Sequence, residues 1–135
     1  MPVVTAPVVS AAYAAVLGLL AAALTVRVIL NRVKTGIQAG DGGNARLAQA
    51  IRAHANLAEQ VPLALLLIVM AEATGTPAGL VHMLGGALVV ARLANAWGLS
   101  RSLGLTTPRQ AGAGLTVLVV AAAALLILYR LLASR

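Results

Sequence analysis

Four apolar segments constrain this chain more than any other feature, because each is longer than the roughly 20 residues of helix that cross about 30 Å of hydrocarbon. The first carries no charge before Arg27, and the fourth carries none between Gln110 and Tyr129. We therefore predict an all-α integral membrane protein, a four-helix bundle with up-down-up-down topology. The expected helices cover about residues 8–33, 45–73, 77–99 and 108–132, in a single transmembrane domain that takes up residues 1–135.

The composition agrees with a membrane protein. Hydrophobic residues make up 61% of the chain and charged residues only 10%, and the mean hydropathy of +0.96 is far too high for a soluble domain. A net charge of +7 suggests nucleic acid as the partner of a soluble chain, but here most basic residues stand at the ends of apolar runs. We therefore expect membrane lipids as partners and no nucleic acid. Because Cys is absent, any thiol chemistry has to use a thiol that a ligand brings.

The distribution of Lys and Arg predicts the orientation in the membrane. With four spans, the first and third connections lie on one side, and only Arg130 and Arg135 belong to the other. By the positive-inside rule the two basic connections are cytoplasmic and both termini are outside. The basic residues in or near these connections are Arg27, Arg32, Lys34, Arg46, Arg52, Arg101 and Arg109.

Residues typical of helix ends mark the connections. Asn44 precedes the second helix as a cap, and Thr107-Pro108 opens the fourth with a cap residue and a proline at the first helical position. Only a short turn around Thr74-Gly75 separates the second and third helices, which therefore form an antiparallel hairpin. The connection from Thr35 to Gly43 is longer and contains four glycines, so we expect a flexible polar loop.

A polar stripe interrupts the second span. Arg52, Asn56 and Glu59 are spaced i, i+4 and i+7, so at about 100° per residue they fall within roughly 60° of one another on one helical face. Ionisable groups inside a membrane are costly and are functional by default. The alternative is that neighbouring helices neutralise Arg52 and Glu59 only to hold the bundle together.

Further arginines are expected at the same membrane depth. Arg27 lies on the first helix and Arg92 on the third, and Arg109 lies in the first turn of the fourth, where free backbone N–H groups favour an anion. This excess of guanidinium groups over one Glu indicates an anionic ligand, since Arg pairs bidentately with carboxylates. Four short-looped helices have no interior for a sizeable ligand, so we expect a site between subunits of an oligomer.

Other polar residues have simpler interpretations. We expect Arg32, Lys34 and Arg46 to extend toward anionic head groups rather than contact a ligand. His54 and His82 are expected to be packing or interfacial residues, because two distant histidines without a carboxylate cluster do not make a metal site.

The polar residues resemble those of a known family. The pattern Arg52-x-x-x-Asn56-x-x-Glu59-x-x-Pro62, followed by Arg92 and a basic residue that opens the fourth helix, is similar to the membrane-associated proteins in eicosanoid and glutathione metabolism, the MAPEG family. The chain length, the long first connection and the expected topology are also similar, so the resemblance covers nearly the whole chain. It implies a homotrimer that binds glutathione between neighbouring subunits near the cytoplasmic face.

The resemblance also implies a role for each residue. By this resemblance, Glu59 is expected to face the amino group of glutathione, and Asn56 is expected to face the peptide backbone of glutathione. Arg109 matches the family arginine that stabilises the glutathione thiolate, and is the implied catalytic residue. The implied activity is that of a membrane glutathione transferase or peroxidase acting on a lipophilic electrophile. The implied glutathione-binding residues are Arg27, Arg52, Asn56, Glu59 and Arg92.

One departure from the family pattern indicates which branch of the family the chain resembles. Eicosanoid-type members carry tyrosines near the end of the third helix, where this chain has Asn95, Trp97 and Leu99. The chain therefore resembles the bacterial-type branch, which implies a bacterial inner membrane. Two alternative functions stay open: a non-catalytic membrane scaffold or lipid-binding protein of the same fold, and a small proton-coupled exporter that uses Glu59. The excess of arginines around Glu59 disfavours the exporter, because its carboxylate would have to accept a cation.

Overall fold

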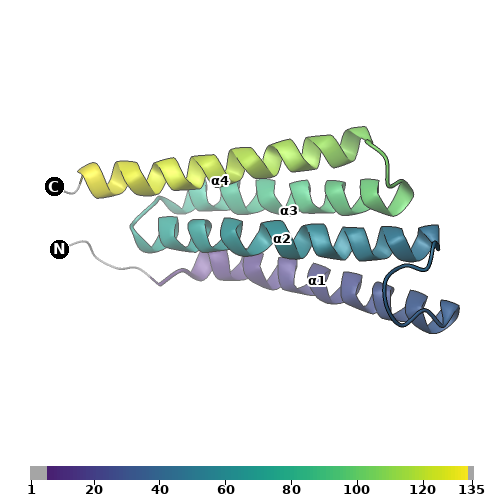
Figure 1. The fold of residues 1–135 in the computed structure, drawn as a ribbon. Coiled ribbons are helices and arrows are strands. Elements are labelled where there is room, and N and C mark those ends of the chain that lie inside the picture. Colours follow the sequence, from purple (N-terminus) through teal and green to yellow (C-terminus); the bar gives the residue numbers. More distant parts are fainter. Residues whose placement is uncertain (1–5, 134–135) are drawn as a thin grey trace.

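The computed structural model describes residues 6–133, and in that range it contains four helices and no strand. Each helix is long and apolar enough to cross a membrane, so the predicted all-α fold with four apolar helices is confirmed. Successive helices run in opposite directions, and the α1–α2 and α3–α4 loops lie together at one end, here named the basic end (Figure 1). The helices are α1 (Val8–Thr35), α2 (Ala45–Ala73), α3 (Ala78–Arg101) and α4 (Thr107–Ala133).

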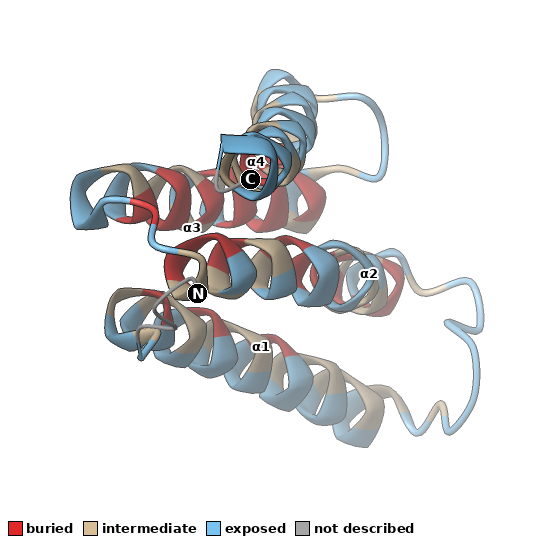
Figure 2. Ribbon diagram, turned by 90° about the vertical axis from the view of Figure 1, so that its left-hand side faces the viewer, coloured by how far each residue is buried: buried red, intermediate tan, exposed pale blue. Residues whose placement is uncertain are grey.

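The four helices form a row rather than a closed ring. α2 packs against α1, α3 and α4, and α3 also contacts α1, whereas α1 and α4 do not touch anywhere along their described lengths. Buried residues gather on α2 and α3, and most of the surface of α1 and α4 is exposed (Figure 2). The outer helices therefore offer broad apolar faces to their surroundings, as membrane-spanning helices do.

α1 is attached through a narrow line of contacts. Its buried residues are Ser10, Leu17 and Leu24, which are seven residues apart and so lie on one face of the helix. Near its start, the ring of Tyr13 lies against Gly85 of α3, where a Cβ atom would collide with the ring. The absence of a side chain at Gly85 thus allows the close approach of α1 and α3.

Gly112 marks the closest approach of α3 and α4, and this contact is testable. A Cβ atom at Gly112 would collide with the Ala91 carbonyl oxygen and come within 3.0 Å of the Asn95 backbone nitrogen. Since backbone atoms cannot move aside easily, Gly112→Ala is expected to lower the free energy of unfolding by about 1–3 kcal/mol. Gly114 on the same helix has nothing within 4 Å of such a Cβ, so Gly114→Ala is the matched control.

Gly114→Ala is expected to be neutral or to stabilise by up to about 1 kcal/mol, because alanine favours the helix. Thermal unfolding of the detergent-solubilised protein compares the two variants directly. Equal melting temperatures for Gly112→Ala and Gly114→Ala would contradict the close α3–α4 contact.

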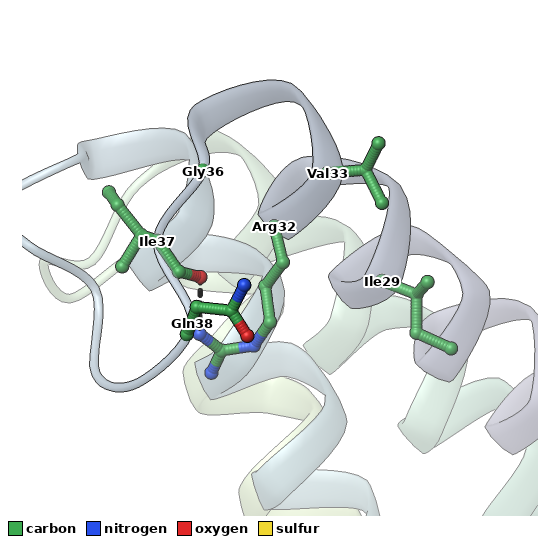
Figure 3. A pocket seen from close by; sticks show the side chains of 6 residues that line it. All are labelled: Ile29, Arg32, Val33, Gly36, Ile37 and Gln38. Atoms are coloured by element: carbon green, nitrogen blue, oxygen red, sulfur yellow. Dashed lines mark hydrogen bonds between the residues drawn. The ribbon is translucent and has the colours of Figure 1, made fainter.

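The α1–α2 loop is held by Arg32. Its guanidinium donates hydrogen bonds to the carbonyl oxygens of Ile37 at 3.1 Å and Gly40 at 3.0 Å. Figure 3 shows Arg32 reaching from α1 toward Ile37 and Gln38 at the start of the loop. Asn44 closes the loop by capping the first turn of α2 with its side chain. Arg32, which we expected to extend to lipid head groups, therefore makes its hydrogen bonds to its own loop.

Candidate functional site

The polar stripe of α2 lies at the surface of the row of helices. Arg52 and Glu59 are exposed and Asn56 is half-buried. Neither Arg52 nor Glu59 makes a hydrogen bond or ion pair with any residue of the chain that the structure describes. Glu59 is the central residue of the 29-residue helix α2, with fourteen residues on either side. It lines a groove between α2 and α4 together with Gln60, Leu63, Val117, Val120, Ala121 and Ala124.

Arg92 connects three helices from the interior. Its side chain is only 2% exposed, although it belongs to α3 of a membrane protein. It donates to Asn56 Oδ1 on α2 at 2.9 Å and to the Gly112 carbonyl oxygen on α4 at 3.1 Å. Its Nε has no partner among the described residues. An arginine can only donate, so Asn56 contributes its oxygen here and keeps both N–H bonds of its amide for another partner.

Asn95 makes a second connection between α3 and α4. Its side-chain amide donates to the Arg109 carbonyl oxygen at 3.1 Å, one turn of α3 beyond Arg92. The Gly112 carbonyl oxygen, which Arg92 contacts, also accepts from the hydroxyl of Thr116 at 2.8 Å. Polar groups therefore bind the first turns of α4 to α3 at the depth of the candidate site.

The side chain of Arg109 is half-buried and points to its own loop. It donates to the carbonyl oxygens of Leu103 at 2.8 Å and Gly104 at 3.1 Å. Only one of its terminal nitrogens is used in this way, and no hydrogen bond joins its guanidinium to the stripe within the described residues. Arg27 on α1 is also half-buried and donates to the hydroxyl of Ser100 on α3.

The predicted site residues thus fall into two groups. The guanidinium groups of Arg27, Arg92 and Arg109 donate hydrogen bonds to acceptors in the same chain. The amide oxygen of Asn56 is the acceptor for Arg92. Arg52 and Glu59 have no partner within the described part of the chain, and they lie on the surface where a second subunit or a ligand has access. The bond between Asn56 and Arg92 is the direct contact that the structure provides between predicted site residues on different helices.

Comparison with known proteins decides the family. The MAPEG family profile matches residues 10–129, from the first turn of α1 to the last turns of α4. This chain belongs to the MAPEG family. Two relatives of this MAPEG protein are both named inner membrane protein YecN, from Escherichia coli strain K12 and from Escherichia coli O6:H1 strain CFT073. Each is 35% identical over 95 residues, which cover 70% of this chain and 72% of the relative.

These findings confirm the predicted resemblance to the family and the predicted location in the inner membrane, whereas the predicted orientation of the termini stays a prediction. With four membrane-spanning helices and inner membrane relatives, this MAPEG protein is a multi-pass inner membrane protein. The names of the relatives state a location and no activity. The chemistry of the candidate site therefore depends on the residues of this chain.

One buried acid of this MAPEG protein lies outside the site that its sequence predicts. Glu72, near the end of α2, is 7% exposed and accepts hydrogen bonds from the backbone nitrogens of Val9 at 2.8 Å and Ser10 at 2.7 Å. It therefore supplies the cap that α1 lacks, since Pro7 at its N-cap position has no capping side chain and its first turn contains no acid. The lack of a capping side chain at the start of α1 was the feature of the sequence that could have indicated this role of Glu72.

A polar pair also joins α1 to α3 far from the basic end. The hydroxyl of Tyr13 is hydrogen-bonded to Nδ1 of His82 at 2.9 Å, with the rings in an edge-to-face arrangement 5.8 Å apart. His82 thus has a partner within the MAPEG fold. Among the residues that the structure describes, no three His, Cys, Asp or Glu side chains lie close enough to hold a metal ion.

Proposed function

We propose that this protein is a membrane glutathione-dependent transferase or peroxidase that acts on a lipophilic electrophile, with its site between neighbouring subunits of a homotrimer. The observation that carries the proposal is the pair Arg52 and Glu59, two opposite charges exposed on one membrane-spanning helix without a partner among residues 6–133. A charged side chain at mid-membrane costs about 2.5–3.5 kcal/mol on insertion scales. Partners from outside the subunit remove that cost.

The two charges suit the two ends of glutathione. This tripeptide carries carboxylates and one ammonium group, which match the guanidinium of Arg52 and the carboxylate of Glu59. Glu59 follows Arg52 by seven positions, which is about 10 Å along the helix axis and is similar to the length of an extended tripeptide at roughly 3.3–3.6 Å per residue. Between them, the free amide N–H groups of Asn56 suit a peptide carbonyl. The donor set therefore fits a bound tripeptide zwitterion.

Arg92 acts in this proposal as a positioning residue. Its guanidinium is buried and donates to Asn56 and to the backbone of α4, so it fixes the orientation of the Asn56 amide rather than touching the ligand. Arg27, hydrogen-bonded to Ser100 between α1 and α3, supports the same end of the bundle.

Arg109 is proposed to act on the sulfur. It lies in the first turn of α4, where its cation and the free backbone N–H groups together favour a thiolate. Glutathione supplies that thiolate when bound, as a nucleophile toward an electrophilic carbon or a peroxide oxygen. The nitrogens of Arg109 that make no hydrogen bond to its own loop are available for this role.

The same reasoning supports the proposed assembly and orientation. Apart from Glu59 and Gln60, the residues that line the groove between α2 and α4 are apolar, which suits the apolar surface of a neighbouring subunit or a lipophilic substrate. The basic end is proposed to face the cytoplasm, with both termini outside, because it carries most of the Lys and Arg residues.

A non-catalytic scaffold is the second candidate. It is favoured by the internal hydrogen bonds of Arg27, Arg92 and Arg109, which stabilise the fold without any ligand. Glutathione binding and turnover separate the two candidates, because a scaffold needs neither.

Calorimetry on the detergent-solubilised protein tests the proposal. We expect glutathione to bind, and Glu59→Gln to weaken binding about ten- to hundredfold, since a hydrogen bond to a charged group contributes about 1.5–3 kcal/mol. Arg52→Gln should behave similarly. Arg46→Gln is the matched control, because Arg46 is an exposed arginine on the same helix outside the stripe. Absence of binding up to millimolar glutathione, or equal affinities of Glu59→Gln and Arg46→Gln, would contradict the proposal.

A further inference from the structure

The end of α3 carries a cation stacked on the chain's single tryptophan. The guanidinium carbon of Arg101 lies 4.1 Å from the centroid of the Trp97 ring, and the Trp97 side chain is 52% exposed. Arg101 is exposed as well, and its guanidinium makes no hydrogen bond or ion pair within the described residues. The ring fixes the position of the cation while all its N–H donors stay unused.

The loop that follows Arg101 is held firmly against α3. Arg109 donates to two of its carbonyl oxygens, and Gly98 has no room for a side chain because Thr106 Oγ1 would lie 2.8 Å from a Cβ atom there. The apolar side chains of this fixed loop nevertheless point outward, with Leu103 44% and Leu105 80% exposed. Exposed leucines in a fixed loop that follows an exposed tryptophan are typical of the layer where lipid head groups meet the hydrocarbon.

Arg101 differs from the other arginines of the basic end that reach the loops. Arg32 donates to the carbonyl oxygens of its own loop (Figure 3), and Arg109 does the same in the second loop. Asp41 is the acid of the first loop, and its carboxylate already accepts from the Gly43 backbone nitrogen. Among the described residues no carboxylate pairs with Arg101, so its guanidinium is available to an anion from outside the chain.

We propose that Trp97, Arg101 and Leu103 form a binding site for the head-group phosphate of an anionic phospholipid. The guanidinium pairs with the phosphate through two parallel hydrogen bonds, the geometry that distinguishes arginine from lysine. The exposed apolar surface at the end of α3 and in its loop contacts the glycerol and the upper acyl chains. This site involves none of the proposed glutathione-binding residues, so it stands whether or not glutathione binds.

Trp97 is itself the reporter for the experiment, because the chain contains one tryptophan. The full chain is reconstituted in phosphatidylcholine vesicles. In one sample a fixed fraction of the lipid is replaced by brominated phosphatidylglycerol, and in the other by brominated phosphatidylcholine. The bromine atoms on the acyl chains of both lipids quench tryptophan on contact. Both leaflets have the same composition, so the orientation of the protein does not affect the result. The ratio of quenching by the two brominated lipids gives the preference for the anionic head group.

We expect brominated phosphatidylglycerol to be preferred about three- to fivefold, the effect of one basic residue close to an anionic surface. Arg101→Gln should bring this preference to about one. Arg46→Gln, which removes an exposed arginine at the same end, should leave it unchanged, because quenching reports only the lipids that contact Trp97 and Arg46 is not part of the proposed site. A wild-type preference near one, a preference that survives Arg101→Gln, or equal losses in the two variants would each overturn the proposal. Circular dichroism verifies that all three proteins are folded.

Discussion

Arg109→Ala is expected to reduce glutathione-dependent turnover by about 10²–10³-fold. This is the loss that typically follows the removal of one group that stabilises a developing or reacting anion in an enzyme site. The reason is local: Arg109 is the proposed cation beside the thiolate at the start of α4, and alanine leaves only the backbone N–H groups there. Turnover is measured with an aryl halide and with an organic hydroperoxide, which report the transferase and the peroxidase reaction separately.

Arg109→Lys separates the charge from the loop contacts. Lysine keeps the positive charge but lacks the planar group that contacts Leu103 and Gly104 together. If the charge stabilises the thiolate, Arg109→Lys should retain much more turnover than Arg109→Ala. The oligomer, followed by size-exclusion chromatography, should be unchanged in both, because the loop contacts are local. Unchanged turnover in Arg109→Ala would remove the thiolate role.

Arg92→Ala is expected to lower the free energy of unfolding by about 2–4 kcal/mol. It removes two interhelical hydrogen bonds, each contributing about 0.6–1.7 kcal/mol in membrane proteins, and leaves a cavity between α2, α3 and α4. Arg52→Ala is the matched control: this exposed arginine has no partner among the residues that the structure describes, and its loss should change stability by no more than about 0.5 kcal/mol. Unfolding in a denaturing detergent measures both.

A double-mutant cycle with Asn56→Ala isolates the bond between Arg92 and Asn56. Residues that share a hydrogen bond couple by about 0.5–3 kcal/mol, whereas independent residues add within about 0.5 kcal/mol. We expect coupling in that range. Additive effects of Arg92→Ala and Asn56→Ala would mean that Arg92 does not position Asn56, and would leave its role to the Gly112 carbonyl oxygen alone.

The fold was predictable because it depends on the length and polarity of segments. Four apolar runs separated by residues typical of helix ends can hardly form anything but four spans, and the structure has four such helices. The row arrangement was not predictable in the same way. It depends on which helices meet closely, and that is decided by single positions such as Gly85 and Gly112, whose neighbours lie on other helices.

The candidate site was predictable only along each helix. The spacing of Arg52, Asn56 and Glu59 placed them on one face of α2, where Arg52 and Glu59 are exposed and have no partner among the described residues. Spacing along one helix carries no information on the neighbouring helix. It therefore did not reveal that Asn56, at the inner edge of the stripe, accepts from the buried Arg92. The roles of these residues toward glutathione stay predictions.

The contact between Glu72 and the start of α1 sets the earliest point during synthesis at which the first helix can be capped. Its carboxylate accepts from Val9 and Ser10, 63 and 62 positions earlier in the chain. During synthesis, the backbone N–H groups at the start of α1 therefore gain this acceptor only when the last turn of α2 has been translated, and water has to satisfy them until then. The α1–α2 hairpin is consequently the smallest piece of the growing chain in which the first span is fastened.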